Sequence, residues 1–263
     1  MNIDYTKYDR FFTFGCSFTG YKYPTWANVM SRNLPKARFY NFGQSGGGNM
    51  FIASRITEAN RKFNFTDTDL IMVMYSTYCR EDRYVRDRGW VTPGNIYTQA
   101  EYDFTDSSYL CNWGDPMTYL VRDLALIDMT DTYLKNLPCD SISMLSVPFN
   151  YQQDDTEFVR EILDIYSDLA ARFPPNMFEE EMNSTWGYSC EYYNGGNSMF
   201  KDYHPSTEQY CNYLEKIGIE MSNEATDFAR NATQILSQIR DEKQFAIAFP
   251  NVDPRIMKRE RLI

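Results

Sequence analysis

Short runs rich in apolar and β-prone residues alternate along the chain with longer stretches in which apolar residues have helical spacing. The short runs predict strands over residues 11–14, 38–42, 69–75 and 140–147. The run DLIMVMY at 69–75 is the clearest, because an apolar segment without alternation is typical of a strand covered on both faces. We expect these strands to form the centre of the fold.

Apolar residues that recur every three or four positions predict helices between and after the strands. These helices cover residues 26–34, 49–63, 117–137, 156–173, 208–219 and 223–243. Strands that alternate with helices need crossover connections, which favour a parallel sheet. The sequence therefore predicts a single three-layer α/β/α domain with a mainly parallel sheet.

Two stretches rich in aromatic residues interrupt the alternation. We interpret residues 80–115 and 176–203 as inserted loops, since long irregular segments in compact domains are commonly functional. The main domain then spans residues 1–221. Residues 222–263 form a C-terminal helical extension and tail packed on the same domain, and the end of the tail is either a docking arm for an assembly partner or loosely held.

Composition excludes several classes of partner. The formal net charge is −10, which argues against nucleic acid and against anionic membrane surfaces, because both need clustered Lys and Arg. Uncharged substrates such as sugars or neutral esters remain open. The polar N-terminus has no signal-peptide pattern, and no apolar run has the length of a membrane span, so we expect synthesis in the cytoplasm.

Cysteine usage bears on metals and redox state. The six cysteines are scattered without C-x-x-C spacing, which favours free thiols in a reducing compartment. No pair of cysteines lies at ligand spacing from the single histidine, which argues against zinc. We expect neither a metal nor another cofactor.

The single histidine, His204, narrows the candidate chemistry. It lies in the segment DYHP at 202–205, and Ser17 follows the first predicted strand in GCSFT at 15–19. A serine hydroxyl needs a base to take its proton, and the imidazole needs a carboxylate to hold its tautomer. Ser17 with His204 and Asp202 is therefore a candidate acyl-transfer site. The structural alternatives are a helix N-cap for Ser17 and a surface position for His204.

Three loops follow the first three strands and are expected to line one crevice, because ligands gather at the carboxyl ends of parallel strands. They hold Ser17, the glycine loop at residues 43–48, and residues 76–80. The glycine loop is either a tight turn, an anion-binding nest or part of an oxyanion hole. No Lys-Ser/Thr pair follows the loop and no basic residue is near it in sequence, which argues against a phosphate-binding site. We favour the oxyanion hole, because it also accounts for Ser17 in the neighbouring loop.

Three blocks in this order resemble the SGNH (GDSL-like) hydrolase family. They are GCSFT at 15–19, NFGQSG at 41–46 and DYHP at 202–205. The resemblance implies a flavodoxin-like fold with Ser17 as nucleophile, His204 as base and Asp202 as its orienting acid. It also implies that the N–H groups of Ser17 and Gly46 hold the oxyanion. Proteins similar to this family with the same D-x-H-P variant occur in bacteriophages.

The chain departs from the family pattern at several positions. Cys16 stands where the family has Asp, and Asp202 precedes His204 by two residues rather than three, with Lys201 at the usual acid position. Tyr78 aligns with the oxyanion-hole Asn, and the loss of one donor costs on the order of 10²–10³ in rate. We expect a third donor at Tyr78, with Thr77 and Arg80 as alternatives.

The sequence thus predicts a serine esterase that removes O-acetyl or other acyl groups from a carbohydrate. Tyr84, Trp90 and Trp113 are the candidate substrate-binding residues, because aromatic faces suit sugar rings. Acyl transfer to another alcohol uses the same three residues. The alternative is a catalytically weak or inactive glycan-binding or structural protein of a larger assembly, such as a phage particle, which would make it virion-associated.

Overall fold

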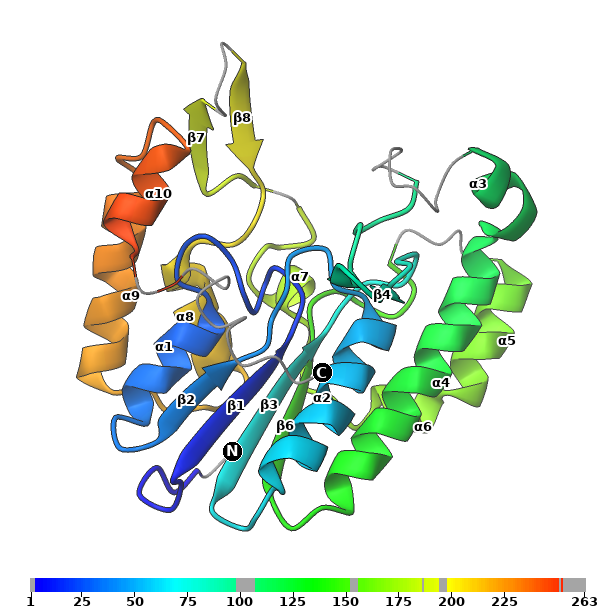
Figure 1. The fold of residues 1–263 in the computed structure, drawn as a ribbon, viewed down its shortest axis with the longest axis horizontal. Helices are drawn as coiled ribbons and strands as arrows, with labels where there is room; N and C mark the ends of the chain where they lie inside the picture. Colours follow the sequence, from blue (N-terminus) through cyan, green and yellow to red (C-terminus); the bar gives the residue numbers. More distant parts are fainter. Residues whose placement is uncertain are drawn as a thin grey trace.

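A parallel sheet of four strands lies at the centre of the protein (Figure 1). The computed structural model describes residues 3–97, 107–151, 156–185, 187–193, 198–250 and 252. The strand order is β2-β1-β3-β6, with all neighbours parallel. The strands are β1 (Arg10–Gly15), β2 (Arg38–Asn41), β3 (Asp69–Tyr75) and β6 (Asp140–Leu145). This is the flavodoxin-like order, and it confirms the predicted α/β class.

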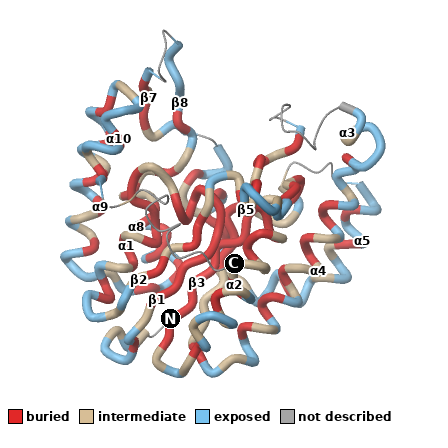
Figure 2. The backbone as a smooth tube through the Cα atoms, viewed as in Figure 1, coloured by how far each residue is buried: buried red, intermediate tan, exposed pale blue. Residues whose placement is uncertain are grey.

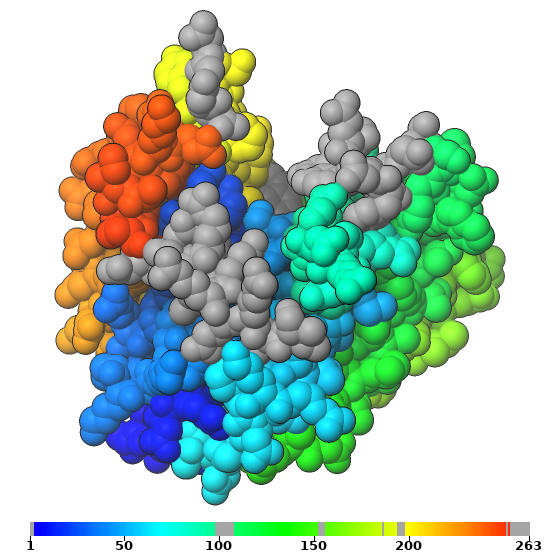
Figure 3. Space-filling model, viewed as in Figure 1, coloured from blue at the N-terminus to red at the C-terminus, as the bar shows by residue number. Residues whose placement is uncertain are grey.

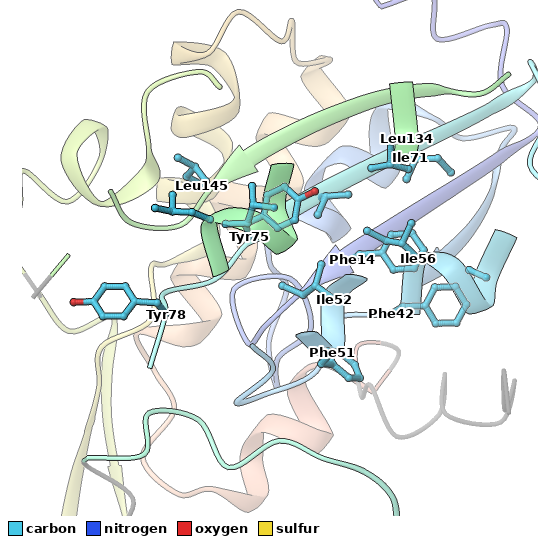
Figure 4. Packing of buried hydrophobic residues seen from close by; sticks show 14 of the residues in the cluster. Phe14, Phe42, Phe51, Ile52, Ile56, Ile71, Tyr75, Tyr78, Leu134 and Leu145 are labelled. Atoms are coloured by element: carbon cyan, nitrogen blue, oxygen red, sulfur yellow. The ribbon is translucent and has the colours of Figure 1, made fainter. Parts of the chain in front are cut away.

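Side chains of the central strands alternate between two helical layers. Phe12, Ile71 and Val73 belong to one apolar cluster, whereas Phe11 and Met72 belong to another on the opposite face. Figure 2 shows these strands buried, and Figure 4 shows packing in the first cluster. The first face is covered by α2 (Asn49–Phe63), α4 (Pro116–Lys135), α5 (Glu157–Ile165) and α6 (Ser167–Ala170). The second is covered by α1 (Trp26–Asn33), α8 (Thr207–Lys216) and α9 (Asn223–Leu236).

Two predicted helices are each divided. The helix predicted over 156–173 is α5 and α6 with a break at Tyr166, and the one predicted over 223–243 is α9 followed by α10 (Lys243–Ala248). Leu236 and Phe245 are both buried in one cluster. At about 100° per residue they would lie on opposite sides of a continuous helix, so the turn between α9 and α10 is what lets both face inward.

Both predicted aromatic loops contain regular structure in their described parts. The stretch 80–115 includes the antiparallel pair β4 (Arg83–Val85) and β5 (Gly89–Val91) and the helix α3 (Ser107–Trp113). The stretch 176–203 includes α7 (Met177–Glu180) and the hairpin β7 (Cys190–Tyr193) with β8 (Met199–Asp202). In β7 the burial alternates, with Tyr192 inside and Tyr193 outside, as in a half-covered strand.

The C-terminal helices support the β7–β8 hairpin. Tyr192 of β7 packs in one cluster with Tyr23, Leu236 of α9 and Phe245 of α10. The segment predicted as an extension therefore covers the hairpin whose last residue is Asp202. The charged end of the tail lies outside the described residues. Among the helices that the structure describes, none is both long and apolar enough for a membrane span.

Gly46 lies where two loops approach closely. Its φ is +76°, in the left-handed region that favours glycine. A Cβ at this position would lie 2.2 Å from the carbonyl oxygen of Thr92, which follows β5. The glycine loop after β2 therefore fits against this segment only without a side chain at position 46.

We expect Gly46→Ala to lower the free energy of unfolding by more than the roughly 1–2 kcal/mol that a left-handed alanine costs by itself. Gly89→Ala is the matched control, because Gly89 has a φ of +73° and no atom within 4 Å of an added Cβ. Urea unfolding of both variants measures the difference. Equal losses would show that the contact with Thr92 does not constrain the loop.

Candidate active site

Ser17, His204 and Asp202 form a continuous hydrogen-bonded chain. The Oγ of Ser17 lies 2.7 Å from Nε2 of His204, and Nδ1 of His204 lies 2.8 Å from Oδ1 of Asp202. Ser17 follows β1 and Asp202 ends β8, so the sheet and the hairpin each contribute one end of the chain. The structure brings the three predicted residues within hydrogen-bond distance.

The loop that carries Ser17 is fixed by its own backbone and by β2. The carbonyl of Cys16 accepts hydrogen bonds from the N–H groups of Thr19 and Gly20, both at 3.0 Å. Asn41, at the end of β2, donates its amide to the Thr19 carbonyl at 2.8 Å and accepts from the N–H of Gly43 at 2.9 Å. Asn41 thus joins the serine loop to the glycine loop.

The imidazole of His204 is held between aromatic rings. Tyr21 stacks on it with ring centroids 3.9 Å apart, and Phe18 meets it edge-on at 5.5 Å. Shortly after it, Ser206 caps α8 by accepting from the N–H of Gln209 at 3.3 Å. These contacts leave the ring one orientation, in which its two nitrogens face Ser17 and Asp202.

Asp202 is fully buried and its two oxygens have separate partners. Oδ1 accepts from the ring and from the backbone N–H of His204, the latter at 3.1 Å. Oδ2 accepts from the hydroxyl of Tyr21 at 2.8 Å and from Nζ of Lys22 at 3.0 Å. Burial raises the pKa of Asp202, but the hydrogen bonds and charge of His204 and the charge of Lys22 outweigh it and hold the pKa well below its usual range.

Lys201, which occupies the usual acid position of the family, faces away from His204. Its Nζ lies 3.4 Å from Glu191 and 4.7 Å from the ring centroid of Tyr188. The two-residue spacing of Asp202 and His204 lets one carboxylate oxygen accept both the ring and the backbone N–H of the histidine. The variant spacing is therefore compatible with an orienting acid.

The glycine loop is anchored by residues that follow β3. Asp82 accepts from the N–H groups of Gly48 and Phe51, each at 2.9 Å, and Arg80 donates to the carbonyl of Gly47 at 2.8 Å. Burial raises the pKa of Asp82 to about 6, although these N–H groups and Arg80 oppose the shift. In the described part of the chain the N–H of Gly46 makes no hydrogen bond.

Tyr78 is buried in the cluster on the α2–α4 side of the sheet. Figure 4 shows it at the margin of that cluster, near Leu145 and Tyr75, with its hydroxyl directed away from the labelled apolar residues. Its expected part in an oxyanion hole stays a prediction. The buried amide after β2, Asn49, is engaged with the backbone of Ser76 and with Asp123.

The three predicted substrate-binding residues do not form one cluster. Tyr84 and Trp90 are cross-strand partners with rings edge-to-face at 5.8 Å, whereas Trp113 is highly exposed at the end of α3. Trp90 also packs edge-to-face on Phe51 and borders a groove between α2 and α4. Within the described residues, no hydrogen bond or ring contact joins these three to Ser17 or His204.

Sequence reasoning missed two groups of residues at this site. Tyr21 and Lys22 both bind Asp202, and their only signal is a short aromatic segment just after the serine block. The second group consists of exposed aromatic residues on and beside the β7–β8 hairpin: Tyr188, Tyr193, Phe200 and Tyr203. Figure 3 shows the surface hollowed between this hairpin and the segment around β4 and β5. The hairpin that flanks this hollow ends at Asp202, two residues before His204.

Several solved structures are similar to this chain. One is a member of the lipolytic G-D-S-L family from Veillonella parvula, with 17% identity, a TM-score of 0.38, and coverage of 79% of this chain and 94% of that one. A catalytic mutant of the acetylxylan esterase Axe2 from Geobacillus stearothermophilus has 16% identity, a TM-score of 0.43, and coverage of 81% and 95%. A gut microbial diltiazem-metabolizing enzyme has 16% identity, a TM-score of 0.39, and coverage of 80% and 47%.

No family model and no curated protein matches the sequence. At these identities and TM-scores, what the site can do has to follow from its own atoms. Those atoms are a serine hydroxyl, an imidazole and a buried carboxylate in hydrogen-bond contact at the end of a parallel sheet.

Proposed function

We propose that the protein is a serine ester hydrolase that removes acyl groups, acetyl groups foremost, from carbohydrates. The observation that carries this proposal is the pair of hydrogen bonds from Ser17 Oγ to His204 Nε2 and from His204 Nδ1 to Asp202 Oδ1, at 2.7 and 2.8 Å. The same geometry serves transfer of the acyl group to a second alcohol, which differs only in excluding water.

In the first half of the reaction, the Oγ of Ser17 attacks the ester carbonyl while Nε2 of His204 takes the hydroxyl proton. The carbonyl oxygen becomes an oxyanion, which we assign to the N–H groups of Ser17 and Gly46, with a third donor near Tyr78. The bond to the leaving alcohol then breaks, and the imidazolium gives its proton to that alcohol. An acyl-serine remains.

In the second half, a water molecule attacks the acyl-serine and gives a proton to Nε2 of His204. The bond between the acyl carbon and Ser17 Oγ breaks, and the imidazolium returns the proton to Oγ. Asp202 stays ionised throughout, because its pKa is held low, and it stabilises the imidazolium in both halves. The carboxylic acid leaves and the enzyme is restored.

The assignment of the substrate to carbohydrates rests on the surface beside the site. The exposed rings of Tyr188, Phe200 and Tyr203 lie on and beside the hairpin that carries Asp202, and aromatic faces pack well against the apolar face of a pyranose. The net charge of −10 disfavours polyanionic substrates. An acetylated neutral oligosaccharide meets both conditions.

We expect a fluorophosphonate probe to modify Ser17 and no other serine, because among the described residues Ser17 is the one whose hydroxyl is bonded to the single imidazole. Peptide mapping by mass spectrometry identifies the modified residue. Ser17→Ala should lose labelling and lose hydrolysis of p-nitrophenyl acetate and of acetylated oligosaccharides, whereas Ser31→Ala on α1 should keep both. A wild-type protein that is neither labelled nor active would favour the alternative of a glycan-binding or structural protein.

At low pH, kcat/KM should depend on the loss of one proton from a single group. His204 is the only histidine, and only its neutral form accepts the proton of Ser17. Asp202 adds no second step near neutral pH, because its pKa is held well below its usual range. We therefore expect kcat/KM to rise with pH with unit slope, and His204→Ala to abolish both this acid limb and nearly all activity. A slope of two would show that another group must also ionise.

Asp202→Asn should lower kcat by about 10⁴-fold, because the amide no longer holds the required tautomer of the imidazole. Lys201→Met is the matched control at the neighbouring position, since Lys201 pairs with Glu191 and not with His204. Rates with p-nitrophenyl acetate compare the two variants. If Asp202→Asn were as active as Lys201→Met, another residue would have to orient His204.

A further inference from the structure

Lys22 lies behind the hydrogen-bonded chain, on the side of Asp202 opposite to His204. Its Nζ is 3.0 Å from Oδ2 of Asp202 and also bonds the hydroxyl of Tyr192. About three quarters of its side chain is withdrawn from solvent, with 23% exposed. A cation in such a position, next to the acid of the candidate site, calls for a specific role.

The ammonium group is enclosed by four aromatic rings. The distances from Nζ to the ring centroids are 4.1 Å for Tyr192, 4.6 Å for Phe245, 5.0 Å for Tyr21 and 5.8 Å for Phe200. Each ring face attracts the cation, and the attraction is stronger where water is excluded. The rings come from the loop after β1, from β7 and β8, and from α10, so three separate parts of the chain hold one lysine.

We propose that Lys22 is a positioning residue for the Ser17–His204–Asp202 chain, which fixes the Asp202 carboxylate in one orientation and offsets its charge. This inference rests on the proposed function. It assigns Asp202 a second positively charged neighbour, Lys22, in addition to the protonated His204.

The orientation of the Asp202 carboxylate follows from the hydrogen-bond donors that its two oxygens accept. Oδ1 accepts two bonds from His204, and Oδ2 accepts from Tyr21 and Lys22. A carboxylate has about four acceptor sites, so these donors leave it no alternative arrangement. Without Lys22 the carboxylate keeps only Tyr21 on Oδ2, and rotation of Oδ2 toward the imidazole becomes less costly.

The charge effect follows from the signs of the three groups. The Asp202 carboxylate stabilises the imidazolium, and the Lys22 ammonium opposes that effect because like charges repel. Removing the ammonium therefore makes the protonated, inactive histidine more stable, and the acid limb of kcat/KM moves to higher pH. A side chain that only fills space would leave the midpoint of the limb unchanged.

The other titratable groups around this pair do not mask the effect. Burial raises the pKa of each tyrosine and of the thiol facing Asp202, the thiol to about 11, so they stay neutral near pH 7. These are Tyr21, Tyr23, Cys190, Tyr192 and Tyr210. Glu242 and Arg240, beside α10, act on Tyr192 and Cys190 respectively and are present in every variant.

The test compares Lys22→Met, Lys22→Gln and the control Lys201→Met in the full chain. Methionine fills the aromatic enclosure without a charge, and glutamine keeps one N–H donor for Oδ2 without a charge. The measurements are the pH profile of kcat/KM with p-nitrophenyl acetate, the fraction of sites labelled by the fluorophosphonate probe, and urea unfolding. Rates are expressed per labelled site, which removes the effect of any unfolded fraction.

We expect both Lys22 variants to move the acid limb of kcat/KM to higher pH than in the wild type, because the like charge is gone. Lys22→Met should also lower kcat on the plateau by more than Lys22→Gln, because it lacks the donor to Oδ2. Lys201→Met should match the wild type, since Lys201 is paired with Glu191.

Two results would overturn the proposal, and each is distinct from a failure of the proposed function. In the first, wild type is labelled and active but both Lys22 variants keep its midpoint and its plateau. In the second, the variants lose only stability toward urea and keep the midpoint, which would make Lys22 a purely structural cation. An unlabelled, inactive wild type would instead reject the hydrolase assignment itself.

Discussion

The buried carboxylate of Asp202 is the constraint around which the C-terminal part of the protein is built. A charge without access to water is tolerated only where its oxygens are fully bonded. Tyr21, Lys22 and His204 provide those bonds, and the β7–β8 hairpin brings the carboxylate to them. The cluster formed with α9 and α10 then excludes water from the far side of the pair. The hairpin and the last helices thus pack through an apolar cluster beside the carboxylate that needs to be enclosed.

The parallel sheet provides the other half of the site. Because β1 lies between β2 and β3, the serine loop has a neighbouring loop on either side. Asn41 bonds it to the glycine loop, and Asp82 bonds the glycine loop to the segment after β3. All three loops are therefore linked through buried or half-buried polar groups. Reacting groups held in this way lose little entropy when a substrate arrives.

The sequence was sufficient for the sheet, because short runs without alternation such as 69–75 are typical of strands covered on both faces, and β3 is buried throughout. It was also sufficient to pair Ser17 with His204, since only one imidazole exists. It was not sufficient for the turn between α9 and α10, because apolar residues recur on both sides of it and the change in phase is recognised only when Leu236 and Phe245 are seen in one cluster. Lys22 was missed for a different reason: nothing local indicates that it meets an acid and a ring from segments that are distant in the chain.

The order of residues in the chain has a consequence for biosynthesis. Ser17 and its loop are synthesised 187 residues before His204, and α10, which contributes a ring beside Lys22, follows later still. Contacts of such high sequence separation form late, after the central strands have been released from the ribosome. A nascent or truncated chain thus presents an isolated serine without its base. On the mechanism proposed above, ester cleavage would begin only after His204 has been synthesised and has reached Ser17.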